Sequence, residues 1–451
     1  MPFHWSSVLN ACLLSTIALT ATAEERQLTF TPKNHDLDGT HNFSSDDQFL
    51  VYDTRGLAGP GIDNSQSIEK VSVDTGKETV LYRPSEILTG PEGMAAPGVG
   101  APYYSVADDV VAFIHGPMVA DVAERGHYAK NNRTGMEVRA DGSGLWRWLD
   151  ARDVSPGDTT PGAHRGGTHD HEYTTEGTRI GITYDDALLP EYDRTIAYLE
   201  RHRNAPEEAS HYFALLVPVA KKGSTKPGEI ERAWGDNWVD EGGTMRAFIG
   251  KVRAEDGVGY GQSLFVVDIP ETVDITTADS GSDTRFPGPP KGTTIRRLTN
   301  DFADGIVRCH EPSARIAYYG GEADGPKQIF IVPARGGAAH PDPTMRPVQM
   351  TNFEKGVTGG LRWHPDGTAI ACIVDNGVAV VSLVEKDGAF GKVTYLTPRN
   401  NSPERLNLVW SHDGKTLAFN KRVETKGPTG EIVTGFDGRD LLQVFLVDSP
   451  K

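Results

Sequence analysis

The sequence predicts an all-β protein that folds as a seven-bladed β-propeller, with the ring closed by an N-terminal strand. Three observations support this: a repeated strand motif, a composition rich in turn-forming residues, and a short phrase that recurs where repeats end. The 451 residues include 50 Gly and 29 Pro and show no long amphipathic helical pattern. Such a composition favours short strands joined by tight turns.

The repeated motif is an aromatic residue followed by a polar turn and a short apolar strand. It is most regular in Trp363-His-Pro-Asp-Gly-Thr-Ala-Ile-Ala371 and Trp410-Ser-His-Asp-Gly-Lys-Thr-Leu-Ala418. Five less regular copies begin at or near Phe43, Tyr104, Tyr173, Trp238 and Cys309. Seven copies at intervals of about 40 to 70 residues are typical of a propeller with one copy in each blade.

Further apolar strands follow the copies, at 67–73, 212–219, 263–269, 328–332, 378–384 and 443–447. Several repeats close with a Leu-Thr or Met-Thr phrase, as at Leu298, Met350 and Leu396. The segment Arg26-Gln-Leu-Thr-Phe30 has the same form but precedes the first repeat. We therefore expect it to be the outer strand of the last blade, which closes the ring.

The aromatic residues that open the copies are expected to fill the core between blades, because a single blade cannot bury both of its faces. Blades two to four are enlarged by insertions at 117–161, 187–210 and 221–236. Long loops on a rigid scaffold often carry function, so we expect the chemistry over blades one to four.

The first 23 residues are interpreted as a signal peptide. An apolar run at 7–20 precedes Ala21-Thr-Ala23, a small-residue cleavage pattern, so a single propeller domain is expected at 24–451 in a secreted or periplasmic protein. No later stretch has the length of a membrane span. The net charge of −17 argues against a nucleic-acid partner but leaves an anionic substrate open. We expect a monomer.

Three histidines are candidate metal ligands. His169 and His171 form a His-x-His pair, which on a regular strand puts both rings on one side, and His41 aligns with His171 in another repeat. The expected ion is divalent: zinc, calcium or manganese. The alternative is that one histidine packs in the channel wall and the other binds substrate or water. No motif for an organic cofactor is present.

His115 and Tyr184 occupy equivalent strand ends in the second and third repeats. Two titratable groups on neighbouring blades form a candidate base and acid, although a strand-end histidine is often only structural. Arginines near the same mouth can bind a carboxylate or sulfate in a bidentate manner. The candidates are Arg165, Arg201, Arg203, Arg308 and Arg362, the last two lying one residue before the repeat motif.

The phrases Phe113-Ile-His-Gly-Pro117 and Gly166-Gly-Thr-His-Asp-His171, with Tyr184-Asp-Asp186, resemble a family of bacterial TolB-like propellers with WD40-like blades. The layout is also similar to the ulvan lyases of polysaccharide lyase family 25. That resemblance implies His115 and Tyr184 as catalytic residues.

The resemblance further implies a helper histidine at His127 and a substrate-binding arginine at Arg203 or Arg201. Trp234 stands where a second tyrosine would be expected, which departs from the pattern of the ulvan lyases. Arg165 is a further candidate for substrate binding.

The leading hypothesis is a secreted polysaccharide lyase that cleaves an ulvan-like, uronate-containing polymer by β-elimination. One alternative is a non-catalytic TolB-like propeller that binds a protein or an envelope polymer. Another is a metal-dependent oligouronide lyase that uses His41, His169 and His171. A glycoside hydrolase is disfavoured because no carboxylate pair stands out.

Overall fold

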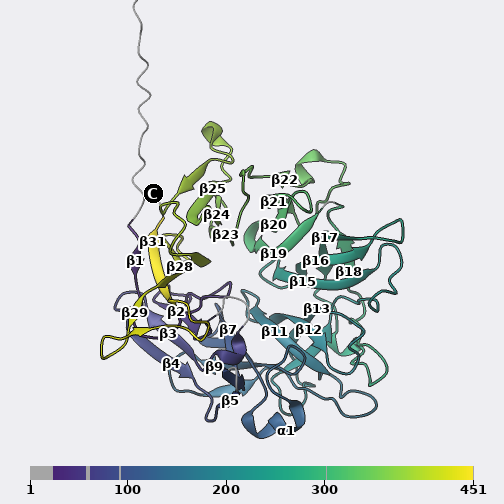
Figure 1. Cartoon of the computed structure of the whole chain (residues 1–451). Helices are drawn as coiled ribbons and strands as arrows, with labels where there is room; N and C mark the ends of the chain where they lie inside the picture. The colour runs from purple at the N-terminus through teal and green to yellow at the C-terminus, as the bar shows by residue number, and fades with distance from the viewer. Residues whose placement is uncertain (1–23, 57–60, 91–92, 301, 450–451) are drawn as a thin grey trace, which may run out of the picture.

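The computed structural model describes residues 24–56, 61–90, 93–300 and 302–449; the predicted signal peptide lies outside them. Seven sheets surround a central channel (Figure 1), which confirms the prediction of an all-β seven-bladed propeller. The one α-helix in the described residues, α1 (Val122–Arg125), is a single turn. None of the described helices is long and apolar enough to span a membrane.

Each blade begins near the channel and runs outward (Figure 1). The strands of blades one to three are β2 (Phe49–Asp53), β3 (Ile68–Ser72) and β4 (Glu78–Tyr82); β7 (Val99–Tyr104), β8 (Val110–His115), β9 (Thr134–Arg139) and β10 (Trp146–Trp148); β11 (Gly166–Tyr173), β12 (Arg179–Asp186), β13 (Thr195–Arg201) and β14 (His211–Leu215). Those of blades four and five are β15 (Ile230–Trp238), β16 (Met245–Arg253), β17 (Tyr260–Asp268) and β18 (Thr294–Arg297); β19 (Ala303–His310), β20 (Arg315–Gly320), β21 (Gln328–Pro333) and β22 (Val348–Gln349).

Blades six and seven complete the ring. Their strands are β23 (Gly359–Trp363), β24 (Ala369–Val374), β25 (Gly377–Ser382) and β26 (Val393–Tyr395); β27 (Arg405–Trp410), β28 (Thr416–Val423), β31 (Leu441–Asp448) and β1 (Arg26–Gln27). Two small ribbons lie outside the blades, β5 (Leu88–Gly90) with β6 (Gly93–Ala96) and β29 (Thr425–Lys426) with β30 (Ile432–Val433).

The N-terminal strand closes the ring, as predicted. Arg26 of β1 pairs with Leu446 of β31, so the last blade contains both ends of the propeller. Glu25 reinforces this closure through ion pairs with Arg405 and Lys421, the second at 2.7 Å. In blade one, isolated bridges at Asp36 and Phe43 take the place of a regular inner strand.

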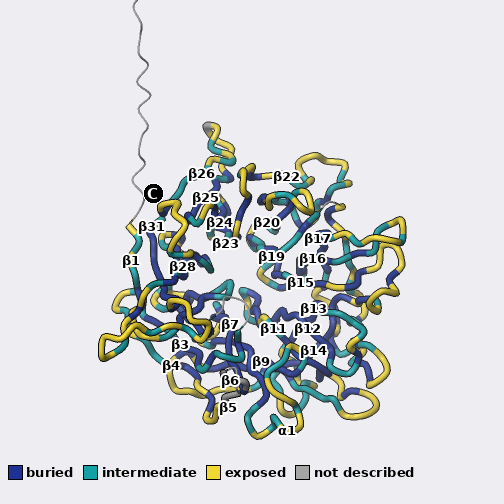
Figure 2. The backbone as a smooth tube through the Cα atoms, in the orientation of Figure 1, coloured by how far each residue is buried: buried dark blue, intermediate teal, exposed yellow. Residues whose placement is uncertain are grey.

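Seven apolar clusters form most of the core, one between each pair of neighbouring blades, and a smaller eighth contains Ile62, Ala101 and Ile114. Figure 2 shows the buried residues concentrated inside the blades and the exposed ones in the loops. The predicted aromatic column lies in these clusters, with no more than 9% of any of its side chains exposed: Phe43, Tyr104, Tyr173, Trp363 and Trp410. Its structural role is confirmed.

A β-bulge interrupts the inner strand in each blade from two to seven. Each bulge contains one residue with a positive φ, and these residues are Ala101, Asp170, Gly235, Gly305, Gly360 and Asn407. A bulge bends the strand and changes which side chains face which side. These bulges therefore determine which side chains line the channel wall.

Candidate functional site in the central channel

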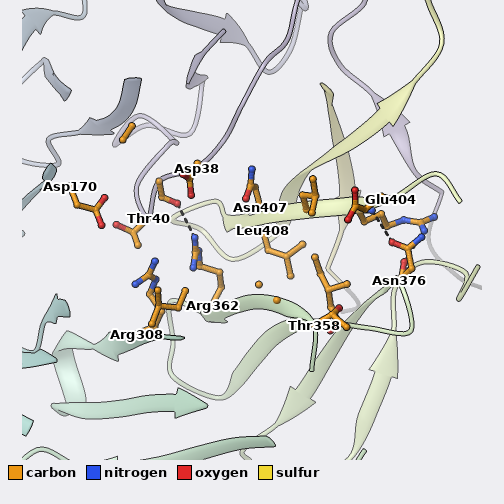
Figure 3. Close-up of a pocket in the computed structure, with 18 of the residues that line it drawn as sticks. Asp38, Thr40, Asp170, Arg308, Thr358, Arg362, Asn376, Glu404, Asn407 and Leu408 are labelled. Atoms are coloured by element: carbon orange, nitrogen blue, oxygen red, sulfur yellow. Dashed lines mark hydrogen bonds between the residues drawn. The ribbon is translucent and has the colours of Figure 1, made fainter. Parts of the chain in front are cut away.

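A cavity of about 960 Å³ occupies one end of the channel. Figure 3 shows side chains from opposite blades pointing into it. All seven blades contribute to its wall, through residues that include Asp38, Ala101, Asp170, Asp236, Arg308, Arg362 and Asn407. Its size is at the upper end of the range of about 300–1,000 Å³ for small-molecule sites.

Arg308 of β19 and Arg362 of β23 place two guanidinium groups in the same part of the cavity (Figure 3). Arg308 donates to the carbonyl of Val307 at 2.7 Å, and Arg362 donates to the carbonyl of Gly39 at 2.9 Å across the channel. Within the described residues neither arginine has a carboxylate partner at ion-pair distance, and the Nε of each is buried without a hydrogen-bond partner.

Burial, together with the charge of Arg308, lowers the pKa of Arg362 to about 9. The two cations therefore destabilise each other in the free protein. An anion placed between them would relieve that repulsion and could accept bidentate hydrogen bonds. The arginine pair is consequently a candidate anion-binding site.

Backbone strain is concentrated on the same wall. Ala101, Asp170 and Asn407 have φ values of 52°, 65° and 51°, a region that residues other than glycine seldom adopt, and all three line the cavity. Strain of this kind persists only where the surroundings enforce it, and it is common at functional sites. Here Asp53 holds the Ala101 amide at 2.8 Å.

His169 of β11 lines the cavity and is only partly exposed. Its Nδ1 is buried and has no hydrogen-bond partner within the described chain. Burial, with Arg133 and Arg194 nearby, lowers the pKa of His169 well below 6.5. The ring is therefore neutral at physiological pH and can accept a proton.

Asp170 follows His169 and is exposed to the cavity. Loss of hydration raises the pKa of the Asp170 carboxyl group above its ordinary value. The positive charge of Arg308 lowers that pKa, but its effect is smaller. Arg194 also lines the cavity and is held by Asp185 at 2.7 Å. The cavity thus combines a neutral imidazole, a carboxyl group with a raised pKa and two cations without carboxylate partners.

The predicted metal ligands are not brought together. A bulge at Asp170 separates His169, which faces the cavity, from His171, which packs beside Thr168 and Asp150 at 3.1 and 3.7 Å. The expectation that both rings project from one side of the strand is therefore wrong. His41 bonds instead to the hydroxyl of Tyr103. No group of three or more His, Cys, Asp or Glu in the described parts of the chain is placed to hold a metal ion.

His115 ends β8 with its side chain fully buried. Its Nε2 bonds the hydroxyl of Tyr82 at 2.9 Å, and its Nδ1 lies 2.5 Å from the carbonyl of Gly116. The ring also packs edge-on against Trp148. Burial lowers the pKa of His115 to about 4, so it is a neutral histidine inside the protein.

Tyr184 on β12 is equally buried. Its hydroxyl donates to Asp186 at 2.8 Å, and Arg165 bonds the same carboxylate. Burial, together with the charge of Asp186, raises the pKa of Tyr184 well above 10. His115 and Tyr184 therefore occupy equivalent strand ends but contact different neighbours, and neither lines the cavity.

The remaining predicted residues are spread over the surface. Tyr184 pairs with Thr195, and Arg201 is at the far end of that strand, roughly 20 Å away, with the exposed Arg203 just beyond it. His127 is exposed on the loop after β8. Trp234 is half-buried beneath Arg232. The structure does not place these side chains around His115 and Tyr184.

Sequence reasoning missed several cavity residues, among them Asp38, Asp170 and Arg194. Asp170 lies inside the His-x-His motif, but the bulge that turns it into the channel has no sequence signature beyond a tolerance of aspartate for positive φ. Arg308 and Arg362 were identifiable, because both precede the repeat motif by one residue.

Comparison with known proteins supports the propeller fold but does not show an activity. Residues 98–207 match a family described as "Protein of unknown function (DUF3748)". The chain is 29% identical over 425 residues to the "Uncharacterized protein YidR" of Escherichia coli (strain K12), covering 87% of this chain and 94% of that protein.

Two solved structures share the propeller over nearly its full length. An oligogalacturonate lyase in complex with manganese superposes with a TM-score of 0.55 and 11% identity, covering 96% of this chain and 95% of that one. An oligogalacturonate lyase from Vibrio parahaemolyticus gives a TM-score of 0.52 and 8% identity, covering 95% and 94%. At these identities the likeness establishes the fold alone.

Proposed function

We propose that this protein is a lyase that cleaves uronate-containing oligosaccharides by β-elimination in the central cavity. The observation that carries the proposal is the pair Arg308 and Arg362, two cations that share one cavity and have no ion-pair partner among the residues that the structure describes. The likeness of the fold to oligogalacturonate lyases supports the same class of substrate.

In this proposal the arginine pair binds the carboxylate of the uronate and stabilises the negative charge that develops when the adjacent carbon loses its proton. His169, whose ring lines the cavity, accepts that proton. The electron pair of the broken carbon–hydrogen bond forms the new double bond, and the bond to the glycosidic oxygen breaks. Asp170, whose pKa is raised, supplies a proton to the leaving oxygen.

The low pKa of His169 suits this role only when substrate is bound. Its proton affinity is depressed by burial and by neighbouring arginines. A bound carboxylate would neutralise part of that positive charge and raise the pKa of His169 toward the working pH. The substrate itself would thus help to activate the base.

A divalent metal ion does not fit the described side chains, since no suitable ligand group is present among them, and the mechanism above uses none. Ulvan, implied by the sequence resemblance, remains a candidate substrate beside oligogalacturonate. A secreted or periplasmic location, which follows from the predicted signal peptide, is likewise a proposal.

The test is to incubate the purified protein with oligogalacturonate, polygalacturonate and ulvan and to follow the ultraviolet absorbance of the unsaturated uronate product. Formation of that product by the protein, but not by an Arg308→Gln variant, is expected. If correctly folded protein binds these uronates without cleaving any of them, the non-catalytic binding propeller replaces the lyase.

A further inference from the structure

A second cavity of about 290 Å³ lies at the other end of the channel. The first cavity reaches the beginnings of β23 and β27, at Gly359 and Arg405. The second is lined by the ends of the same strands, at Trp363 and Trp410, and by the turns that follow. The two cavities therefore open toward opposite faces of the ring.

The arginine pair forms part of both cavities. Thr40, Arg308 and Arg362 line the first and the second alike, so the guanidinium groups stand at the boundary between them. An anion can approach this pair from either face. Because the pair is shared, the site has one set of cations for two entrances.

Besides the arginine pair, Trp410 and His41 line the second cavity. The indole Nε1 of Trp410 is buried and has no hydrogen-bond partner in the described residues, while Trp410 itself is only 9% exposed. Because this nitrogen is closed to the cavity, Trp410 contributes an aromatic surface and no donor. Burial and the nearby His412 lower the pKa of His41 to about 3. Its ring is therefore uncharged near neutral pH and neither attracts nor repels an anion by charge.

Two acidic residues line this mouth, Glu241 and Glu311, and the second opposes an anion less than its type implies. Burial raises the pKa of Glu311 to about 7, so this carboxyl group is partly protonated near neutral pH. The remaining surface is largely aromatic, with Trp363 and Trp410 at its sides. A ligand that combines a carboxylate with a compact ring matches both features.

We propose that the second cavity binds a single carboxylate-bearing sugar, with its carboxylate on the shared arginine pair and its ring between Trp363 and Trp410. The requirement for a carboxylate follows from the two arginines. The choice of a uronate as the sugar rests on the proposed lyase function. Since only one anion can occupy the pair, a monosaccharide bound from this face excludes an oligosaccharide from the other.

The experiment is isothermal titration calorimetry of the full-length mature protein with D-galacturonate, and with D-galactose as the uncharged control. Saturable binding of galacturonate but not of galactose is expected. Trp410→Phe should weaken galacturonate binding several-fold, because part of the aromatic surface against the sugar ring is lost. The matched control Trp146→Phe, at an exposed position on β10, should bind as the wild type does.

A second variant guards against a folding defect in Trp410→Phe. Val106 lies on a surface turn and lines the second cavity but not the first, so Val106→Trp should block galacturonate binding. Equal binding by wild type, Trp410→Phe and Val106→Trp would overturn the proposal, as would equal binding of galactose. Binding that follows the expected pattern without cleavage of any oligomer would refute the lyase function alone.

Discussion

The central cavity and the tops of blades two and three contain the same kinds of side chain in opposite circumstances. In the cavity, Arg308, Arg362 and His169 have nitrogen atoms without partners. At the blade tops, both ring nitrogens of His115 and the hydroxyl of Tyr184 are already bonded within the protein. Both regions are rich in titratable groups, but Arg308, Arg362 and His169 line a cavity that a ligand can enter, whereas His115 and Tyr184 are fully buried away from it.

This difference shows why residue type alone is a weak guide to a site. A buried polar group with its bonds satisfied stabilises the fold, whereas an unpartnered group beside a cavity costs stability and persists for another reason. The cavity also collects the strained inner-strand positions of blades two, three and seven. If this difference decides function, substitutions in the cavity should impair activity and substitutions at the blade tops should impair stability.

The largest effect is expected at the arginine pair. Arg308→Gln should lower kcat/KM on uronate oligomers by about 100-fold to 1,000-fold, because a preorganised group that stabilises the developing charge is removed. Steady-state kinetics would measure it. The matched control Arg139→Gln alters an exposed arginine paired with Asp141 on blade two and should leave the rate unchanged. Equal losses of kcat/KM in both variants would contradict a specific role for the cavity arginines.

A loss of similar or somewhat smaller size is expected at the base. His169→Gln should reduce kcat by at least about 100-fold, since positioned proton transfer contributes that much, while galacturonate binding at the arginine pair persists. Kinetics and calorimetry on the same variant would separate the two. Loss of binding with kcat retained would make His169 a binding group.

The blade tops should respond in stability and in its pH dependence. The pKa of His115 is about 4 in the folded protein against 6.5 for the unperturbed group, so the unfolded state binds more protons as pH falls between these values. Protonation then removes up to about 3 kcal/mol of stability. Denaturant titrations should show that His115→Gln loses less stability than wild type between about pH 7 and about pH 4; a parallel loss in both proteins would contradict this assignment.

Tyr184→Phe is expected to cost about 2 kcal/mol of unfolding free energy, because the buried carboxylate of Asp186 loses one of its donors. Arg165 still bonds that carboxylate, so turnover should stay within a few-fold of wild type. Thermal unfolding and kinetics would be measured together. If activity collapses while the fold survives, the catalytic centre lies at the blade tops, as the resemblance to ulvan lyases implies.

The smallest effect is expected for Arg203→Gln. Arg203 is exposed beyond the far end of β13, distant from both regions compared here. Activity, substrate affinity and stability should all remain at the wild-type level. A raised KM would show instead that the substrate reaches the other end of blade three.

The sequence was sufficient for the ring but not for its wall. The spacing of the repeats that begin at Trp363 and Trp410 located the blades, since every repeat must bury the same faces. The segment at Arg26 predicted that the N-terminal strand closes the ring. The sequence could not reveal the bulges, because Asp170 adopts a positive φ through its surroundings rather than its identity. One extra residue in a strand reverses the side toward which the following side chains point. His169 and His171 therefore project in different directions.

The closure of blade seven has a consequence for synthesis on the ribosome. Because β1 pairs with β31, Arg26 and Gln27 must wait for the strand at Leu441–Asp448 before the ring can shut. Until then β28 presents an unpaired edge, and such edges readily pair with other chains. The nascent protein is therefore most exposed to misassembly after six blades are made, and chaperone protection matters most in that interval.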